Sequence, residues 1–347
     1  MRNVLVCAVQ TPYIRGGAEI LVEDLRDRLA SRGYRVDVVS VPFRAYPPSE
    51  IVRQALAWRL LDLTESWGEK VDLVIPTKFP SWLVSHPRKV PWLFHQHREA
   101  YDLLGSRFCA FSESDEDLRV VAAIRAMDAT GLGECRERFA ISRNVAGRLA
   151  RFNGLEAEAL YPPPRHVGRY RSEGYGDYLF YAGRLEPLKR VDLLVAALAR
   201  CRGLRLKIAG TGPQEADLRE QVARAGLDGR VDFLGFVSDE DLIDLYARCR
   251  AAAYAPLNED YGYVTVEAFL SGRPVVTTAD SGGPLEFVAD GETGLVAAPD
   301  AEALGDTLSR LGALDEGRLR AMGEEGRRRV AGIGWGRVLD RLTASLA

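Results

Sequence analysis

The chain has 347 residues, of which 47% are hydrophobic and 27% are charged; this length fits two ordinary domains, and this composition excludes a disordered or fibrous protein. The formal net charge is -3 and the acidic and basic residues are interspersed, which argues against a nucleic-acid binder. No apolar run approaches the roughly 20 residues of a spanning helix, and a predicted strand begins at residue 4, so we expect no membrane span, no signal peptide and a cytoplasmic location.

The cysteines and histidines indicate neither disulfides nor a metal site. The five cysteines are scattered, odd in number and without a Cys-x-x-Cys pair, so we interpret them as thiols of a reducing compartment: Cys7, Cys109, Cys135, Cys201 and Cys249. His95 and His97 flank Gln96, but neither a cysteine nor an obvious third ligand lies nearby. We therefore expect no metal and no cofactor.

The first half of the chain opens with a βαβ pattern. A strand is predicted at residues 4–9, then a helix with Leu21, Leu25 and Leu29 on one face, and then a second buried strand at 36–41. A parallel α/β sheet follows from this alternation.

Gly16 and Gly17 lie between the first strand and its helix, where a missing Cβ lets a phosphate or a sugar approach the backbone. The dinucleotide fingerprint G-x-G-x-x-G is absent, and the second strand does not end in an acidic residue. A glycine turn without a ligand is the alternative.

Residues 50–64 predict an amphipathic helix that packs on the protein rather than on a membrane, because its charges are mixed. Peripheral membrane contact through the regions of Trp58 and Trp82 stays open, although no basic patch supports it. Further strands are predicted at 71–76 and 91–94, and His95 follows the second of these at the sheet edge where ligands gather. A histidine held only by backbone groups is the alternative there.

Residues 139–142 predict the last strand of the first domain, and 144–152 predict its helix, which Asn153-Gly154 ends. Tyr161-Pro-Pro-Pro164 can continue neither a helix nor a central strand, so it predicts a stiff connector. We place the first domain at 1–164 and the second at 165–333.

The second domain is predicted to begin with a strand at 178–182 and a helix at 191–199. Arg184 and Lys189 form a cationic pair in the loop between them. Arginine forks onto phosphate oxygens, lysine supplies a compact charge, and the helix N-terminus adds its dipole, so this loop suits a leaving diphosphate. Two solvated surface cations are the alternative.

The segment 254–276 carries the strongest chemical signal. A short strand at 251–255, a polar loop, a helix at about 262–270 and a strand at 274–277 are predicted there. Glu259 and Glu267 lie eight positions apart across the loop and the helix. Carboxylates accept hydrogen bonds from vicinal diols, so the pair suits a ribose and a sugar ring. An ordinary helix with one solvated and one capping carboxylate is the alternative.

These motifs, in this order, resemble the GT4 family of retaining glycosyltransferases, also called glycosyl transferases group 1. The resemblance covers almost the whole chain, from the glycine turn to the Gly-Gly-Pro-x-Glu sequence at residues 282–286. It implies an α/β GT-B fold, in which two Rossmann-like domains with parallel sheets face an interdomain cleft. It also implies that the last helix, at 334–347, crosses back to the first domain.

The resemblance also implies roles for single residues. Glu267 would hold the ribose and Glu259 the sugar ring, while Arg184 and Lys189 would stabilise charge on the leaving diphosphate. His95, Gly16 and Gly17 would contact the donor from the first domain. The other donor-binding candidates are Gly212, Phe236, Val237, Tyr261, Gly262, Tyr263 and Val264, and the acceptor-side candidates are His97, Asp102 and Ser142.

The implied reaction moves a sugar of the glucose, N-acetylglucosamine or mannose type from a UDP or GDP donor to an acceptor hydroxyl, in glycan biosynthesis. The acceptor, whether glycan, lipid-linked or small molecule, stays open, and the departing phosphate helps to deprotonate it. Asp260 and Tyr263 depart from the common pattern and leave the donor sugar open. The alternatives are a nucleotide-sugar epimerase of GT-B fold and a non-catalytic sugar-nucleotide-binding protein.

Overall fold

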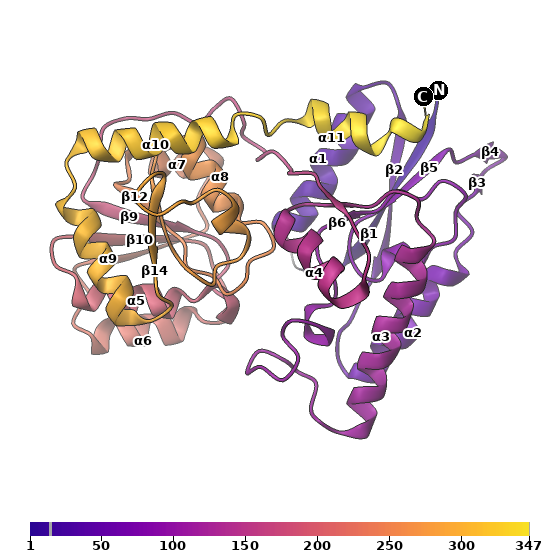
Figure 1. Cartoon of the computed structure of the whole chain (residues 1–347), viewed down its shortest axis with the longest axis horizontal. Coiled ribbons are helices and arrows are strands. Elements are labelled where there is room, and N and C mark those ends of the chain that lie inside the picture. The colour runs from indigo at the N-terminus through magenta and orange to yellow at the C-terminus, as the bar shows by residue number, and fades with distance from the viewer. Residues whose placement is uncertain (14–15, 347) are drawn as a thin grey trace. The chain divides into compact units, whose positions relative to one another are not determined.

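The computed structural model describes residues 1–13 and 16–346. The chain divides into two compact units, Met1–Arg165 with Ile333–Ala347 and His166–Gly332 (Figure 1). Ile14 and Arg15 of the glycine-turn segment, and Ala347 of the expected last helix, lie outside the described residues.

The first unit is built on short parallel strands. β1 (Asn3–Gln10), β2 (Arg35–Pro42) and β5 (Leu73–Pro76) form one sheet in the order β2-β1-β5, and β6 (Trp92–Leu93), β7 (Phe139–Ala140) and β8 (Glu158–Ala159) form another in the order β6-β7-β8. The N–H of Phe94 donates to the carbonyl of Thr77 at 2.8 Å, which joins the two sheets. β3 (Glu65–Ser66) and β4 (Glu69–Lys70) form an antiparallel hairpin.

Two expectations for these strands are wrong. β2 is not a buried strand: its residues alternate between exposed and half-buried, because it is the edge strand of its sheet. The strand at 139–140 is not the last of the unit, since β8 pairs with it in parallel. β8 has only two residues and no apolar run, which is why the sequence pattern does not reveal it.

The helices of the first unit begin and end where local chemistry requires. They are α1 (Gly17–Ser31), α2 (Pro48–Leu60), α3 (Asp115–Gly133) and α4 (Arg143–Asn153), with 3-10 turns η1 (Ser81–Leu83) and η2 (Arg98–Ala100). The hydroxyl of Ser114 accepts from the N–H of Asp117 at the start of α3, which is a serine N-cap. α4 ends at Gly154, whose φ of 64° is in the left-handed region, as the sequence predicts.

The C-terminal segment is part of the first unit. α11 (Trp335–Leu342) is followed by the turn η5 (Ala344–Leu346), and the side chains of Val338, Leu339 and Leu342 are buried. The guanidinium of Arg341 donates to the carboxylate of Glu158 at 2.6 Å. Helix α11 therefore packs against residues that lie more than a domain away in sequence.

The second unit has one six-stranded parallel sheet. Its strands are β9 (Tyr178–Ala182), β10 (Arg205–Ala209), β11 (Val231–Gly235), β12 (Ala251–Ala253), β13 (Val275–Thr278) and β14 (Gly294–Ala297). Their order is β11-β10-β9-β12-β13-β14. The chain thus builds outward from β9 in one direction and from β12 in the other, and the strand order reverses between these neighbours.

Helices cover both faces of this sheet. α5 (Val191–Arg200), α6 (Glu215–Arg224) and α9 (Ala301–Ala313) lie on one side, and α7 (Asp239–Arg248), α8 (Tyr263–Leu270) and α10 (Glu316–Val330) lie on the other (Figure 1). The turn η3 (Pro187–Lys189) lies between β9 and α5, and the turn η4 (Gly283–Glu286) lies between β13 and β14. The predicted α/β class with parallel sheets is confirmed.

Trp58 and Trp82 are only 1% and 0% exposed. Their side chains belong to the core of the first unit and are not available for the membrane contact that the sequence left open. None of the helices in the described part of the chain combines the length and apolarity that a bilayer crossing requires.

Candidate functional site

The candidate site of the second unit lies where its strand order reverses. β9 and β12 are hydrogen-bonded neighbours, and the loops that leave their carboxyl ends carry Lys189 and Glu259. In open parallel sheets, ligands bind at such a switch point. The topology therefore brings together two residues that the sequence only proposes separately.

The backbone around Glu259 is held on both sides. Its N–H donates to the carbonyl of Ser281 at 2.8 Å, and its carbonyl accepts from the N–H of Gly283 at 2.8 Å. The N–H of Leu257 donates to Leu188 of the other loop at 2.8 Å. Gly283 has to be glycine here, because a Cβ would lie 2.6 Å from the carbonyl oxygen of Tyr261. The loops after β9 and β13 thus fix the backbone of the loop that carries the Glu259 carboxylate.

Lys189, Glu259 and Tyr254 form one polar cluster. The Lys189 ammonium pairs with the Glu259 carboxylate at 2.5 Å and donates to the Tyr254 hydroxyl at 3.3 Å, while that hydroxyl donates to the same carboxylate at 2.9 Å. Burial opposes the charge of Lys189, but the carboxylate of Glu259 outweighs it, so the pKa of Lys189 is raised. Lys189 therefore stays cationic, in the loop after β9, over the whole neutral range.

Arg190 holds this cluster in place, and the sequence analysis did not single it out. Its guanidinium is buried, donates to the carbonyls of Ala255 and Pro256, and makes a forked pair with Asp280 at 2.6 and 2.8 Å. The backbone of Arg190 has a φ of 48°, which turns the chain from η3 into α5. An arginine directly after a loop lysine is a weak signal in sequence, since most arginines are solvated.

Arg184 has a different environment from Lys189. Its guanidinium pairs with Glu186 at 2.8 Å, and 39% of its side chain is exposed. The two cations are therefore bound to different carboxylates, and the structure does not show them acting as one pair.

Glu267 lies in α8 and contacts two tyrosines. The hydroxyl of Tyr246 donates to its carboxylate at 2.9 Å, and Tyr170 lies beside the same carboxyl. Burial raises the pKa of Glu267, although the hydrogen bond from Tyr246 and the neighbouring hydroxyl of Tyr170 oppose the shift. Neither tyrosine was predicted as a site residue; both lie outside segment 254–276, at 170 and 246.

The loop that leads into α8 carries four predicted donor contacts. Tyr261 is buried, Gly262 has a φ of 84° and precedes the first residue of the helix, and Tyr263 and Val264 form its first turn. A Cβ at Gly262 would lie 2.9 Å from the ring of Pro284. The N–H groups of such a first turn point out of the helix and suit an anion.

The remaining predicted donor contacts are at neighbouring strands. Phe236 and Val237 follow β11, and the side chain of Phe236 is 91% exposed. Gly212 follows β10, and a Cβ there would lie 2.4 Å from the carbonyl oxygen of Leu185. Close packing between two loops is therefore a sufficient reason for glycine at position 212.

In the first unit, Gly16 and Gly17 begin α1 beside a charged pair. The N–H of Gly16 donates to the Glu19 carboxylate at 2.9 Å, and the ammonium of Lys78 pairs with the same carboxylate at 2.8 Å. Burial would raise the pKa of Glu19, but Lys78 and the Gly16 N–H lower it overall. The Gly16 N–H thus has a protein acceptor already.

His95 follows β6 and its backbone pairs with that of Lys78. Its Nδ1 lies 2.8 Å from the carbonyl oxygen of Gln96. A carbonyl only accepts, so Nδ1 carries a hydrogen and Nε2 is the basic nitrogen of the neutral ring.

The three acceptor-side candidates are all built into the first unit. His97 packs edge-on against Phe43 and Phe111 and tilted against Phe79, and burial together with His95 lowers its pKa to about 4. Asp102 pairs with Arg98 at 2.7 Å and with Arg148 at 3.3 Å. Ser142 is buried and caps α4. His97 is therefore neutral at physiological pH and could offer only a neutral contact.

No group of three or more histidine, cysteine, aspartate or glutamate side chains suited to a metal is present within residues 1–13 and 16–346.

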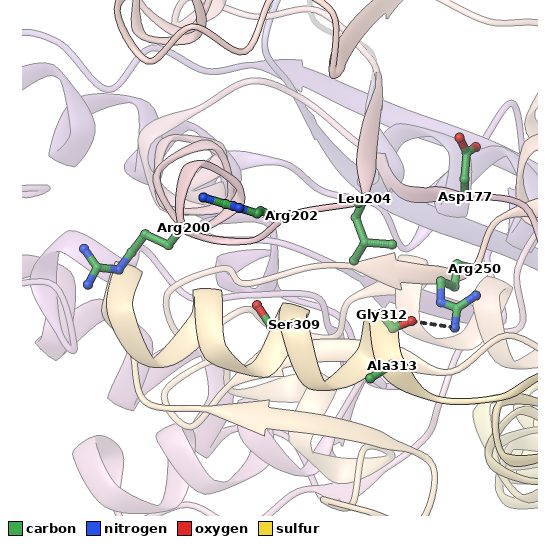
Figure 2. Close-up of a pocket in the computed structure, with 9 residues that line it drawn as sticks. Asp177, Arg200, Arg202, Leu204, Arg250, Ser309, Gly312 and Ala313 are labelled. Carbon is green, nitrogen blue, oxygen red and sulfur yellow. Dashed lines mark hydrogen bonds between the residues drawn. The ribbon is translucent and has the colours of Figure 1, made fainter.

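A hollow of about 530 Å³ lies in the second unit, but at the other edge of its sheet (Figure 2). Asp177, Leu204 and Arg250 line it, and these residues precede β9, β10 and β12. Arg250 is engaged there, because it donates to the carbonyl of Gly312 at 3.0 Å. This hollow is therefore separate from the loops at the carboxyl ends of the strands.

Solved structures share the whole fold. Sucrose-phosphate synthase from Thermosynechococcus elongatus superposes with a TM-score of 0.75 at 20% identity, covering 98% of this chain and 99% of that one. Anabaena HepE, solved in complex with UDP and glucose, gives a TM-score of 0.67 at 20% identity, covering 99% of both chains. WaaG, a glycosyltransferase involved in lipopolysaccharide biosynthesis, gives a TM-score of 0.74 at 18% identity, covering 97% of this chain and 99% of that one, and the fold of the chain is accordingly GT-B.

Sequence comparison gives the family. The family model described as "Glycosyl transferases group 1" matches residues 169–329. A protein of Corynebacterium efficiens named D-inositol 3-phosphate glycosyltransferase is 32% identical over 378 residues, covering 99% of this chain and 89% of the relative. The chain belongs to the glycosyl transferases group 1 family, as the GT4 resemblance indicated.

Another relative of the same name, from Nocardia farcinica, is 31% identical over 294 residues, covering 76% of this chain and 62% of the relative. The chain thus spans less than two thirds of that protein. The relatives bear glycosyltransferase names, and the comparisons lend no support to the epimerase alternative.

Proposed function

We propose that the protein is a retaining glycosyltransferase that moves a sugar from a nucleoside diphosphate donor to an acceptor hydroxyl. The observation that carries the proposal is the cluster of Lys189, Glu259 and Tyr254 at the switch point of the second unit. The family and the fold agree with it. The metal-free and cofactor-free reaction expected from the sequence remains part of the proposal.

Lys189 is the cation that we assign to the leaving diphosphate. Its contacts with Glu259 and Tyr254 use two of its three N–H bonds, and the third can reach a phosphate oxygen. Because the carboxylate keeps the ammonium charged, this electrostatic contribution is present before the donor binds. Arg184 is proposed as a second phosphate contact that leaves Glu186 when the donor arrives.

Glu259 and Glu267 are assigned to hydroxyl groups of the donor. Glu259 is proposed to bind the sugar ring and Glu267 the ribose, with the N–H groups at the start of α8 on a phosphate. The other donor contacts proposed from the sequence, including those of Gly16, Gly17 and His95, stand as part of the same assignment. Departure of the phosphate is proposed to assist deprotonation of the acceptor.

A UDP-sugar is the donor that we propose first, because structural relatives were solved with UDP or UDP-glucose. HepE was solved with UDP-glucose and TarM of S. aureus with UDP and alpha-GlcNAc-glycerol. For the acceptor we propose a hydroxylated small molecule, and inositol phosphate is the first to test, since the relatives are named for it.

The test is calorimetric titration of the protein with UDP, GDP, ADP and their glucose, N-acetylglucosamine and mannose derivatives. We expect one base to bind, and we expect Lys189→Ala to weaken its binding about 10-fold to 100-fold, as a charged hydrogen bond contributes roughly 1.5–3 kcal/mol. Lys207→Ala is the matched control. It also removes a lysine of the second unit, but Lys207 lies on β10, over the ring of Tyr178 of β9, and not in the cluster of Lys189, Glu259 and Tyr254.

The donor that binds is then incubated with the acceptor panel, and the anomeric configuration of the product is determined by NMR. Retained configuration supports the proposal. Inversion of configuration, or a donor that epimerises without any acceptor, would contradict it. Absence of binding by every nucleotide would leave the binding role of Lys189 without support and overturn the donor assignment.

A further inference from the structure

A polar network runs through the first unit from α3 to the segment that carries His95, and all of its side chains are buried except the half-buried Asn153. The carboxylate of Asp128 accepts from the indole N–H of Trp82 at 2.8 Å and from the hydroxyl of Tyr101 at 2.7 Å. That hydroxyl accepts from the Nδ2 of Asn153 at 3.2 Å, and the Oδ1 of Asn153 accepts from the Nε2 of Gln96 at 2.6 Å. We call these five residues the Asp128 network.

The direction of every hydrogen bond in the Asp128 network follows from its two ends. Trp82 can only donate, and an ionised carboxylate can only accept. Tyr101 must therefore give its single hydrogen to Asp128, and its oxygen is left to accept from Asn153. The amide of Asn153 is then oriented, so Gln96 has to donate to it.

Gln96 is the far end of the network. Its side chain is 0% exposed, and its Oε1 has no hydrogen-bond partner among residues 1–13 and 16–346. It stands between His95 and His97, and the carbonyl of Gln96 is the group that accepts from His95 Nδ1. The orientation of the Gln96 side-chain carboxamide thus decides whether its carbonyl oxygen or its NH₂ group faces away from Asn153.

We propose that Asp128 is a positioning residue for the transfer reaction: its carboxylate orients the Gln96 carboxamide through Tyr101 and Asn153, and this fixes the segment that carries His95. The inference deepens the proposed function and rests on it, because His95 is there assigned to the donor sugar. Asp128 itself touches neither substrate in this assignment.

Loss of the Asp128 charge should reverse the whole network. An asparagine at position 128 would accept from Trp82 with its oxygen, so its NH₂ would donate to Tyr101. Tyr101 would then donate to Asn153, and Asn153 to Gln96, whose NH₂ would replace the carbonyl oxygen on the far side. Each hydrogen bond of the network is kept with its direction reversed, and the far-side group of Gln96 lacks a partner among residues 1–13 and 16–346 in both orientations, so the reversal should cost little stability.

Protonation of Asp128 has the same effect as this substitution. Burial raises the pKa of Asp128 to about 7, against the hydrogen bonds from Tyr101 and Trp82. The charged groups on the elements around it have partners of their own: Arg125 of α3 donates to Ala100, Arg59 of α2 pairs with Glu134, and Arg148 of α4 pairs with Asp102. At pH values above 7, the network should therefore keep the orientation in which Tyr101 donates to Asp128 and Gln96 donates to Asn153.

The first experiment is a stability cycle at pH 8 with Asp128→Asn, Gln96→Glu and the double variant. With Asp128 ionised, a glutamate at position 96 gives the network two acceptor ends, so we expect the melting temperature of Gln96→Glu to fall by roughly 5 °C or more. Asp128→Asn should change it little. In the double variant the acceptor end has moved to position 96, and most of the loss should be recovered.

The second experiment measures transfer by the same variants with the donor identified above. We expect Asp128→Asn to lower kcat about 10-fold to 100-fold with little change in the donor KM, since misplacement of a reacting group affects the rate. The wild-type kcat should fall toward that of the variant below pH 7, while the variant shows no such step. Asp115→Asn, in the first turn of the same helix, is the control and should keep the wild-type kcat.

Additive changes in melting temperature would show that positions 96 and 128 are not coupled and would overturn the network. Coupled melting temperatures with an unchanged kcat for Asp128→Asn would overturn the positioning role alone. A wild-type protein that transfers no sugar would instead overturn the proposed function, and the stability cycle would still decide on the network.

Discussion

At the scale of single residues, the buried carboxyl group of Glu267 makes the stability of the fold depend on pH. Burial raises the pKa of its carboxyl above the ordinary value of 4.5. Between pH 4.5 and the folded pKa, the folded state therefore keeps a proton that the unfolded chain has lost. The contribution of the protonated Glu267 to the free energy of unfolding is complete below pH 4.5 and is lost as the pH rises through the folded pKa.

We predict that Glu267→Gln removes this loss, since Gln can still accept from Tyr246. The free energy of unfolding of the variant, relative to wild type, should rise from pH 4.5 upward and then level off. Urea denaturation at a series of pH values measures it. Glu302→Gln, at an exposed carboxylate of α9, should track the wild type. A constant difference at all pH values would contradict the direction of the shift.

At the scale of elements, α10 packs against α8 through glycines. A Cβ at Gly323 would lie 2.0 Å from the carbonyl oxygen of Gly272, and one at Gly326 would lie 2.3 Å from the ring of Phe269. α10 can approach this closely only because these positions carry no side chain. The spacing of three residues places both glycines on one face of the helix.

Gly323→Ala should therefore destabilise the protein by about 1–3 kcal/mol, the usual effect of overpacking. Gly147 in α4 is the matched control: nothing lies within 4 Å of its Cβ position, so Gly147→Ala should stabilise the helix by about 0.5–1 kcal/mol. Chemical denaturation of both variants provides the comparison. The expected effects have opposite signs, which makes the pair informative, and a neutral Gly323→Ala would refute the close packing.

At the scale of the whole molecule, the last helix belongs to the first unit although it follows the second unit in sequence. Leu342 of α11 is buried there, and truncating a buried leucine costs about 2–5 kcal/mol. Unfolding of such a chain need not be two-state, because each unit has its own core.

We predict that Leu342→Ala lowers the temperature of the same calorimetric transition as Leu25→Ala of α1. The transition whose temperature Leu308→Ala of α9 lowers should stay unchanged in Leu342→Ala. Differential scanning calorimetry of the three variants tests this. If Leu342→Ala followed Leu308→Ala instead, the division of the chain into these two units would be wrong.

The sequence by itself determined the elements with strong local signals. The strand at 178–182 and, to within one residue, the helix at 191–199 have the bounds that their apolar pattern predicts, because strand and helix periodicity are properties of neighbouring residues. The order of its motifs also indicated the family and the GT-B fold. The strand β2 was predicted but its half exposure was not, because edge position depends on which strands pair and not on local composition. The strand β8 was not predicted, because two residues without an apolar run give no pattern.

Only the tertiary structure decided which side chains act together. Lys189 and Glu259 lie 70 positions apart and meet because β9 and β12 are neighbours in the sheet. Arg190 is buried rather than solvated because three loops converge on it, and Gln96 reaches Asn153 across 57 positions. Distance along the chain says nothing about such contacts. The hydrogen-bond direction of the Asp128 network follows in turn from the contact between Trp82, which can only donate, and the ionised carboxylate, which can only accept.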